Sequence, residues 1–219
     1  NNKQAYKLSE EALMATPPRL RSYQTLGDVY IDFGSYHSFE NYSRQLDLST
    51  GITSIKYRSG GVNYTRELFV SAPENCIVMR LTADKPGAIN CNIILSRERD
   101  VSISPLGNNG LLMSGQITDM PNALQGPGGR HMKFHSQLKA SSKDGKVAAN
   151  HNSILVTNSS SVTIIITAAT DYNFEKLNFD RSINSRTICN NIISKASAIP
   201  YDQLVKNHLN EYQEMFGRV

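Results

Sequence analysis

Residues 75–96 read NCIVMRLTADKPGAINCNIILS, and this stretch decides the fold class. Two runs with apolar residues at alternate positions, 75–83 and 89–96, flank the turn-forming residues DKPG. Alternation with a period of two places successive side chains on opposite faces of a β-strand. We therefore predict an antiparallel hairpin. Its facing apolar pairs would be Leu81 with Cys91, Met79 with Ile93, and Ile77 with Leu95.

The cysteines are expected to be free thiols. In the predicted hairpin Cys91 belongs to the apolar face, whereas Cys76 falls on the other face of its strand, so the two cannot bridge in this register. The chain has three cysteines and no CxxC or Cys/His spacing typical of zinc sites. No P-loop or GxGxxG motif occurs either. We expect no metal site and no cofactor.

The same period continues along the chain from about residue 23 to residue 170. In DVYIDF, residues 28–33, the apolar side chains share one face, and Asp28 and Asp32 lie on the other. The unbroken apolar run at residues 164–166 predicts a strand buried on both faces. Many short strands at close spacing favour a large antiparallel β-sandwich.

Both ends of the chain change to a helical period. Residues 4–15 have apolar positions near helical spacing, and the prolines that follow would end this helix. Beyond residue 172, two helical stripes predict two amphipathic helices. Their members are Ile188, Ile192, Ile193 and Ala196, then Leu204, His208, Tyr212 and Met215. We expect His208 to pack against a neighbouring element.

These patterns together predict a mainly β protein. Its centre would be a large antiparallel β-sandwich, or super-sandwich, with a short N-terminal helix and C-terminal linker helices. The predicted divisions are a helical lead-in at 1–20, the sandwich at 21–172 and a helical linker at 173–219.

Candidate carboxylate pairs do not match a glycosidase dyad. Asp28 and Asp32 would lie about 13 Å apart at ~3.3 Å per strand residue, whereas glycosidase pairs are about 5–9.5 Å apart. His131 and His135 are similarly far apart, because HMKFHSQL is typical of a strand and not of a metal-binding helix. We expect no catalytic residue in this chain.

Composition excludes two classes of partner. The chain has 219 residues and a net charge of +4, and its basic residues are scattered, so we expect no nucleic-acid partner. No apolar run approaches the ~20 residues that span a membrane, and no signal sequence precedes the first helix.

Aromatic side chains are the remaining candidates for contacts with a ligand. Tyr30, Tyr36, Phe39 and Tyr42 could form a platform on which sugars stack, although packing within half-buried strands is the simpler explanation for them. We name Tyr36, Tyr42 and His131 as candidate sugar contacts or cleft-edge residues.

Several motifs, in this order, resemble the N-terminal domain of glycoside hydrolase family 95, the α-L-fucosidase family. They are YQTLGDVYIDFG at 23–34, YSRQLDLSTG at 42–51, GGVNYTRELFVS at 60–71, VMRLTADKPG at 78–87, GGRHMKFHSQLKA at 128–140, TAATDYN at 167–173 and LVKNHLNEYQEMFGRV at 204–219. The resemblance therefore covers essentially the whole chain.

The resemblance implies an N-terminal β-sandwich, a helical linker, an (α/α)6 barrel and a small C-terminal β domain. The implied reaction is hydrolysis of α-L-fucosides or related L-sugars with inversion, by carboxylates in the barrel. This chain would then brace its own catalytic domain and be inactive alone. Fucosylated glycans would be partners of the parent enzyme, which we expect to be secreted or periplasmic. The alternatives are an independent carbohydrate-binding sandwich and a structural surface or adhesin sandwich.

Overall fold

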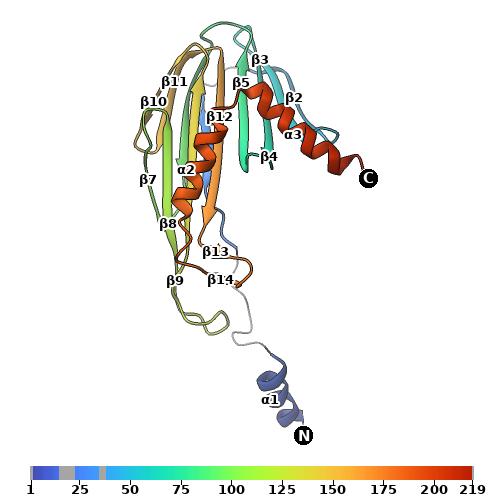
Figure 1. Ribbon diagram of the computed structural model, residues 1–219, viewed down its shortest axis with the longest axis vertical. Coiled ribbons are helices and arrows are strands. Elements are labelled where there is room, and N and C mark those ends of the chain that lie inside the picture. Colours follow the sequence, from blue (N-terminus) through green and yellow to red (C-terminus); the bar gives the residue numbers. More distant parts are fainter. Residues whose placement is uncertain (1, 15–22, 35–37, 219) are drawn as a thin grey trace.

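The computed structural model describes residues 2–14, 23–34 and 38–218, and it is an antiparallel β-sandwich of two unequal sheets (Figure 1). The smaller sheet contains β1 Asp28–Asp32, β6 Ile89–Ser96, β11 Ser153–Ser159 and β10 Lys146–Asn150, in that order. The larger sheet contains β2 Glu40–Asp47, β3 Ile52–Ser59, β4 Val62–Ser71, β5 Cys76–Ala83, β12 Ser161–Thr170, β9 Gly129–Ser142, β8 Gly110–Asp119 and β7 Val101–Pro105. A separate short hairpin contains β13 Tyr172–Asn173 and β14 Asn178–Phe179. The predicted mainly β sandwich is confirmed.

Two apolar cores hold the molecule together. The first fills the space between the sheets, with Ile93 from the smaller sheet and Leu138 from the larger. The second lies on the outer face of the larger sheet, beneath helices. Strand β12 contributes to both, because Ile164 faces the first core and Ile165 faces the second. The predicted strand buried on both faces is therefore confirmed.

The hairpin predicted at residues 75–96 is wrong. Strand β5 lies in the larger sheet, where Leu81 pairs with Val162, and β6 lies in the smaller sheet, where Cys91 pairs with Val156. The DKPG turn carries the chain from one sheet to the other. Leu81 and Cys91 still share the inter-sheet core, but from opposite layers. Alternation reports which face is apolar, and two strands in facing sheets satisfy it as well as two paired strands do.

The cysteines are free, as predicted, and all three are buried. Cys91 lies in the inter-sheet core, whereas Cys76 lies in the core beneath the helices. Desolvation raises the pKa of all three thiols, those of Cys76, Cys91 and Cys189, to about 11. These thiols are therefore protonated packing groups at neutral pH.

Two helices cover the outer face of the larger sheet (Figure 1). Helix α2, Ser185–Ala196, packs on β9 and β12, and α3, Tyr201–Phe216, packs on β4. The side chain of Asn184 caps α2 by accepting from the Thr187 N–H at 3.0 Å. Within the predicted stripe, Ile193 and Ala196 are buried, whereas Ile188 is 39% exposed. Cys189 is fully buried, so the buried face is rotated slightly from the prediction.

The first half of α3 is pinned firmly to the sheet. Leu204 is fully buried, and the Tyr201 hydroxyl donates to Glu67 at 3.0 Å. Burial and the neighbouring Glu67 raise the pKa of Tyr201, so this phenol keeps its proton. Asn207 donates to Glu74 at 2.6 Å, and His208 packs on Phe69 as predicted. The helix therefore leaves the sandwich in a fixed direction.

The N-terminal helix α1, Asn2–Leu13, has no buried residue and lies apart from both sheets (Figure 1). The predicted boundary between residues 20 and 21 lies outside the described residues. The other predicted boundary, between 172 and 173, falls within β13 and stays a prediction. Among the described residues, no helix is long and apolar enough to cross a membrane.

Candidate functional site

The candidate contact residues do not form one site. His131 lies on β9 and Tyr42 on β2, five positions apart in the larger sheet. At ~4.8 Å between neighbouring strands this separates them by about 24 Å. Tyr36 lies outside the described residues. A sugar contact by any of the three stays a prediction, but His131 and Tyr42 cannot line one cleft together.

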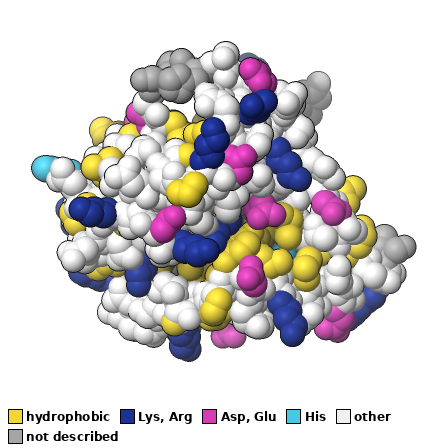
Figure 2. Space-filling view, turned by 90° about the horizontal axis from the view of Figure 1, so that it is seen from above, with side chains coloured by type: hydrophobic (Ala, Val, Ile, Leu, Met, Phe, Trp, Pro, Cys, Tyr) yellow, Lys and Arg dark blue, Asp and Glu magenta, His cyan; other side chains and the backbone are white. Residues whose placement is uncertain are grey.

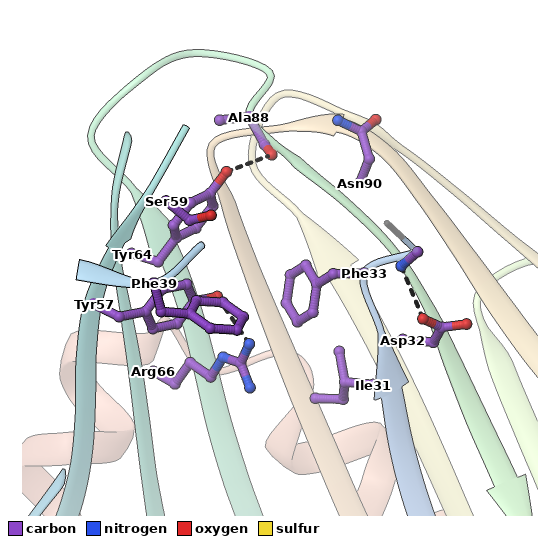
Figure 3. A pocket seen from close by; sticks show the side chains of 11 residues that line it. Ile31, Asp32, Phe33, Phe39, Tyr57, Ser59, Tyr64, Arg66, Ala88 and Asn90 are labelled. Atoms are coloured by element: carbon purple, nitrogen blue, oxygen red, sulfur yellow. Dashed lines mark hydrogen bonds between the residues drawn. The ribbon is translucent and has the colours of Figure 1, made fainter. Parts of the chain in front are cut away.

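One hollow lies where β1 ends, facing β3 and β4 (Figure 3). Its volume is about 410 Å³. Phe33 follows β1, Tyr57 comes from β3, and Tyr64 and Arg66 come from β4. Phe39 is the one member of the predicted aromatic platform that reaches this hollow among the described residues. We call it the aromatic–arginine hollow.

Arg66 occupies the middle of the aromatic–arginine hollow. Its guanidinium carbon lies 4.6 Å from the Phe33 ring centroid and 5.1 Å from that of Tyr57, so the cation stacks on both rings. Its Nη2 donates to the Tyr57 hydroxyl at 2.8 Å. Its Nε is buried and has no hydrogen-bond partner among the described residues. The hollow therefore combines ring faces with one unused donor.

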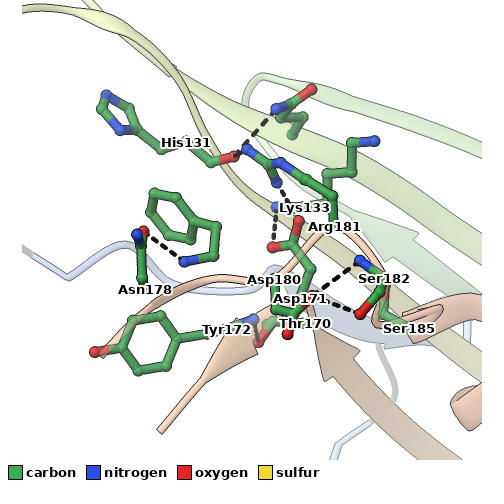
Figure 4. Close-up of polar contacts among 12 residues, drawn as sticks. His131, Lys133, Thr170, Asp171, Tyr172, Asn178, Asp180, Arg181, Ser182 and Ser185 are labelled. Carbon is green, nitrogen blue, oxygen red and sulfur yellow. Dashed lines mark hydrogen bonds and ion pairs between the residues drawn. The ribbon is translucent and has the colours of Figure 1, made fainter. Parts of the chain in front are cut away.

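A second group of polar contacts, the Asp171 clasp, joins β9 to the segment before α2 (Figure 4). The Asp171 side chain is 2% exposed and is ion-paired with Arg181. Its other oxygen accepts the backbone N–H of Lys133 at 2.8 Å. Arg181 also donates to the carbonyl of His131 at 2.8 Å. Both oxygens of this buried carboxylate are bound by other parts of the chain, so the role of Asp171 is structural.

His131 belongs to the surroundings of this clasp. Its Nε2 lies 3.4 Å from the Asp119 carboxylate, and its ring meets Phe179 edge to face at 6.1 Å. Beside it, hydrogen bonds from Ser182 lower the pKa of Asp180 to about 2. Sequence reasoning missed the clasp. Its only signal was an aspartate directly after a buried strand, within the TAATDYN motif.

The carboxylates near β1 do not form a pair. Asp28 and Asp32 lie on the exposed face of the strand, as the alternation predicted. Asp32 accepts the backbone N–H of Gly34 at 2.8 Å. Among the described residues, no group of three or more His, Cys, Asp or Glu side chains could hold a metal ion. In the view of Figure 2, basic and acidic side chains are interspersed.

A family comparison matches residues 1–175 to "Glycosyl hydrolase family 65, N-terminal domain". The chain is 29% identical over 217 residues to "Alpha-L-fucosidase 2" of Arabidopsis thaliana, covering 90% of this chain and 26% of that protein. It is 36% identical over 73 residues to "Probable alpha-fucosidase A" of Aspergillus niger, covering 33% of this chain and 9% of that protein. The chain thus spans about a quarter of the length of the Arabidopsis relative.

Among solved structures, a "Putative kojibiose phosphorylase from human microbiome" has a similar fold, with a TM-score of 0.52 at 12% identity. The match covers 84% of this chain and 27% of that protein. Two unequal antiparallel sheets with helices on one outer face therefore define a β-sandwich domain that matches only part of a longer chain. The chain belongs to the glycosyl hydrolase family 65 N-terminal domain family.

Proposed function

We propose that residues 1–219 are the non-catalytic N-terminal β-sandwich, with the start of the helical linker, of a family 95 α-L-fucosidase. The observation that carries this proposal is the similarity to Alpha-L-fucosidase 2 over 217 residues, which span only 26% of that protein. The catalytic carboxylates would then belong to another part of the polypeptide. The motifs of residues 23–34 and 60–71 support family 95 in particular.

The physical role of this domain would be to brace the catalytic domain. Helix α3 would lead toward the catalytic domain, and Leu204 and His208 fix its first half to the sheet. Its last turn presents Met215 and Phe216, which are 55% and 43% exposed. Phe216 stacks on Tyr212 at 5.6 Å, and the Tyr212 hydroxyl donates to the carbonyl of Leu48 at 2.8 Å. Helix α3 is fixed to the sheet at its start and exposes apolar side chains at its end. Those side chains could pack against the catalytic domain and make the connection between the two domains rigid.

The test is an activity assay on this chain and on its full-length parent. With an aryl α-L-fucoside as substrate, the parent should release the aryl group with inversion at the anomeric carbon. The isolated 219-residue chain should show no turnover above the uncatalysed rate. Turnover by the isolated chain that a single Asp or Glu substitution abolishes would overturn the proposal.

A second candidate function, an independent carbohydrate-binding module, is favoured by the aromatic–arginine hollow. Ring faces and a spare guanidinium donor are groups that bind sugars. However, Arg66 already fills the space between the Phe33 and Tyr57 rings. Calorimetry with fucose and fucosylated oligosaccharides separates the two functions. A dissociation constant below the millimolar range, lost in Arg66→Ala, would favour the binding module over the brace.

The third candidate is a structural or adhesin-type sandwich, and the reading frame around this segment distinguishes it. Paired helices over several hundred further residues would support the fucosidase, and a cell-wall anchor would support the adhesin. We further propose, from the family resemblance, that the parent is secreted or periplasmic. Cell fractionation with an antibody to the sandwich tests that proposal.

A further inference from the structure

A polar hollow opens on the outer face of the larger sheet, beside α2. Its volume is about 360 Å³. The turn between β7 and β8 forms one wall, α2 forms the other, and β9 contributes the rest. The lining residues include Leu106, Asn109, Gln137, Lys139, Asn190 and Ser194. We call this site the Gln137 hollow.

Both walls of the Gln137 hollow are held in place by the protein itself. In the turn, the Leu106 N–H donates to the carbonyl of Gly110 at 2.8 Å. The side-chain amide of Asn109 donates to the carbonyl of Ala140, also at 2.8 Å. On the other side, Ile193 buries its side chain against the sheet and anchors α2. A preformed hollow needs little ordering when a ligand binds, which favours binding.

Gln137 has an unmet hydrogen-bonding need. Its side chain is fully buried, and its Nε2 donates to Oδ1 of Asn190. Its Oε1 has no hydrogen-bond partner among the described residues. If both amides turn over, this bond reverses and Nε2 of Gln137 becomes the atom without a partner. Buried polar groups are almost always satisfied, because an unpaired one is unfavourable. Gln137 therefore needs one more partner in either orientation.

The rim of the hollow offers further polar groups beside an apolar wall. Asn190 and Ser194 are exposed on α2, so their side chains are open to a ligand. The ammonium of Lys139 donates to the Ser197 hydroxyl at 3.0 Å and carries two further protons. Lys139 is the one charged residue among those that line the hollow, and Leu106 supplies apolar surface. Hydroxyl groups next to a C–H face match this lining.

We propose that the Gln137 hollow binds one neutral sugar unit through neighbouring hydroxyl groups. One hydroxyl meets the Gln137 amide, directly or through one water, and the next ones bind Asn190 and Lys139. The C–H face of the sugar ring packs on Leu106. Ligand pockets measure about 300–1,000 Å³, so a hollow at the small end of this range suits a single unit. The proposal holds whether or not the parent is a fucosidase.

An anion fits the Gln137 hollow less well than a hydroxyl group does. A carboxylate or sulfate would suit Lys139, but at neutral pH it has only acceptor atoms. It could therefore partner Gln137 in just one of the two amide orientations. A hydroxyl group donates and accepts, so it partners both. Lys139 also shares its charge with the Ser197 hydroxyl already.

Protection of a thiol at the rim tests the proposal in the full-length protein. Ser194→Cys places the thiol in the hollow, and Asn191→Cys, exposed on the same helix but outside the lining, is the matched control. Maleimide adducts at each position are followed by mass spectrometry, with L-fucose and D-glucose as probes. A sugar at ten times its dissociation constant leaves about a tenth of the hollows free, so at least one probe should slow Ser194→Cys about tenfold. Asn191→Cys should react at an unchanged rate.

Substitutions at the rim identify the groups that bind. Protection of Ser194→Cys should be lost when Asn190→Ala or Lys139→Met is added, and kept when Arg66→Ala is added. Asn190 is exposed, so its substitution should leave the circular dichroism spectrum unchanged.

Four outcomes would overturn the proposal. The first is no protection by either sugar, and the second is equal protection at positions 191 and 194. The third is protection by sulfate or D-glucuronate alone, which would assign the hollow to anions. The fourth is a Ser194→Cys thiol that does not react even without sugar, which would show that another part of the polypeptide covers the hollow.

Discussion

The imidazole of His208 stacks on the ring of Phe69, with 4.7 Å between centroids and 29° between planes. The same imidazole donates through Nε2 to the carbonyl of Thr50, 2.8 Å away. One side chain thereby ties α3 to β4 and to the turn between β2 and β3. His208 is 3% exposed, so this contact between the helix and the sheet is buried.

We expect His208→Ala to lower the free energy of unfolding by about 2–3 kcal/mol. The change removes a buried ring and leaves the Thr50 carbonyl without its donor. Urea denaturation followed by circular dichroism measures the loss. Lys206→Ala, at an exposed position on the same helix, should change stability by less than about 0.5 kcal/mol. Equal effects of the two substitutions would show that α3 is not pinned through His208.

Asp171→Asn should destabilise the clasp that joins β9 to α2. Asparagine keeps the shape but removes the charge that pairs with Arg181, so we expect a loss of about 2–4 kcal/mol. Residues near 172–181 should also become more sensitive to limited proteolysis. Glu175→Gln, which removes an exposed charge from the same segment, is the control and should do neither. A fully stable Asp171→Asn variant would contradict the structural role of the clasp.

His135 should make the stability of the fold depend on pH. Burial lowers the pKa of His135, and the nearby charges of Arg186 and Lys133 lower it further. In the unfolded chain the ring titrates near its ordinary pKa of about 6.5. As the pH falls through that value, the unfolded state takes up the proton first, so the free energy of unfolding falls.

The measurement is urea denaturation between about pH 5 and pH 7. His135→Gln should reduce the dependence on pH in this range, because the titrating ring is gone. His151→Gln, at an exposed histidine, is the matched substitution for comparison. Parallel pH profiles for His135→Gln and the unsubstituted chain would refute the assignment.

The sequence predicts which face of a strand or helix is buried better than it predicts which strands pair with one another. Alternation placed Cys91 in the core and Asp28 on the surface, and helical spacing placed His208 against a neighbour. Alternation did not reveal that Leu81 and Cys91 enter the inter-sheet core from opposite sheets, because both are buried in either arrangement. Pairing between distant strands, such as β5 with β12, depends on the whole set of contacts.

The polar interactions were harder to foresee. Asp171 and Arg181 are ten residues apart with a short hairpin between them, and no local rule links them. Tyr42 and His131 were grouped by chemistry, but the order of strands separates them. Arg66 carried no signal of its own, because a single arginine on a strand is usually solvated. Its position between two rings follows only from how β1 faces β4.

The central claim is that this segment carries no catalytic group. The most direct test replaces each of its 19 Asp and Glu residues by the corresponding amide in the full-length protein and measures kcat on an aryl α-L-fucoside. Every variant that folds should keep kcat within about threefold of the unsubstituted enzyme. Loss of a catalytic carboxylate can cost on the order of ten-thousandfold in kcat. One folded variant with a thousandfold lower kcat would contradict the account.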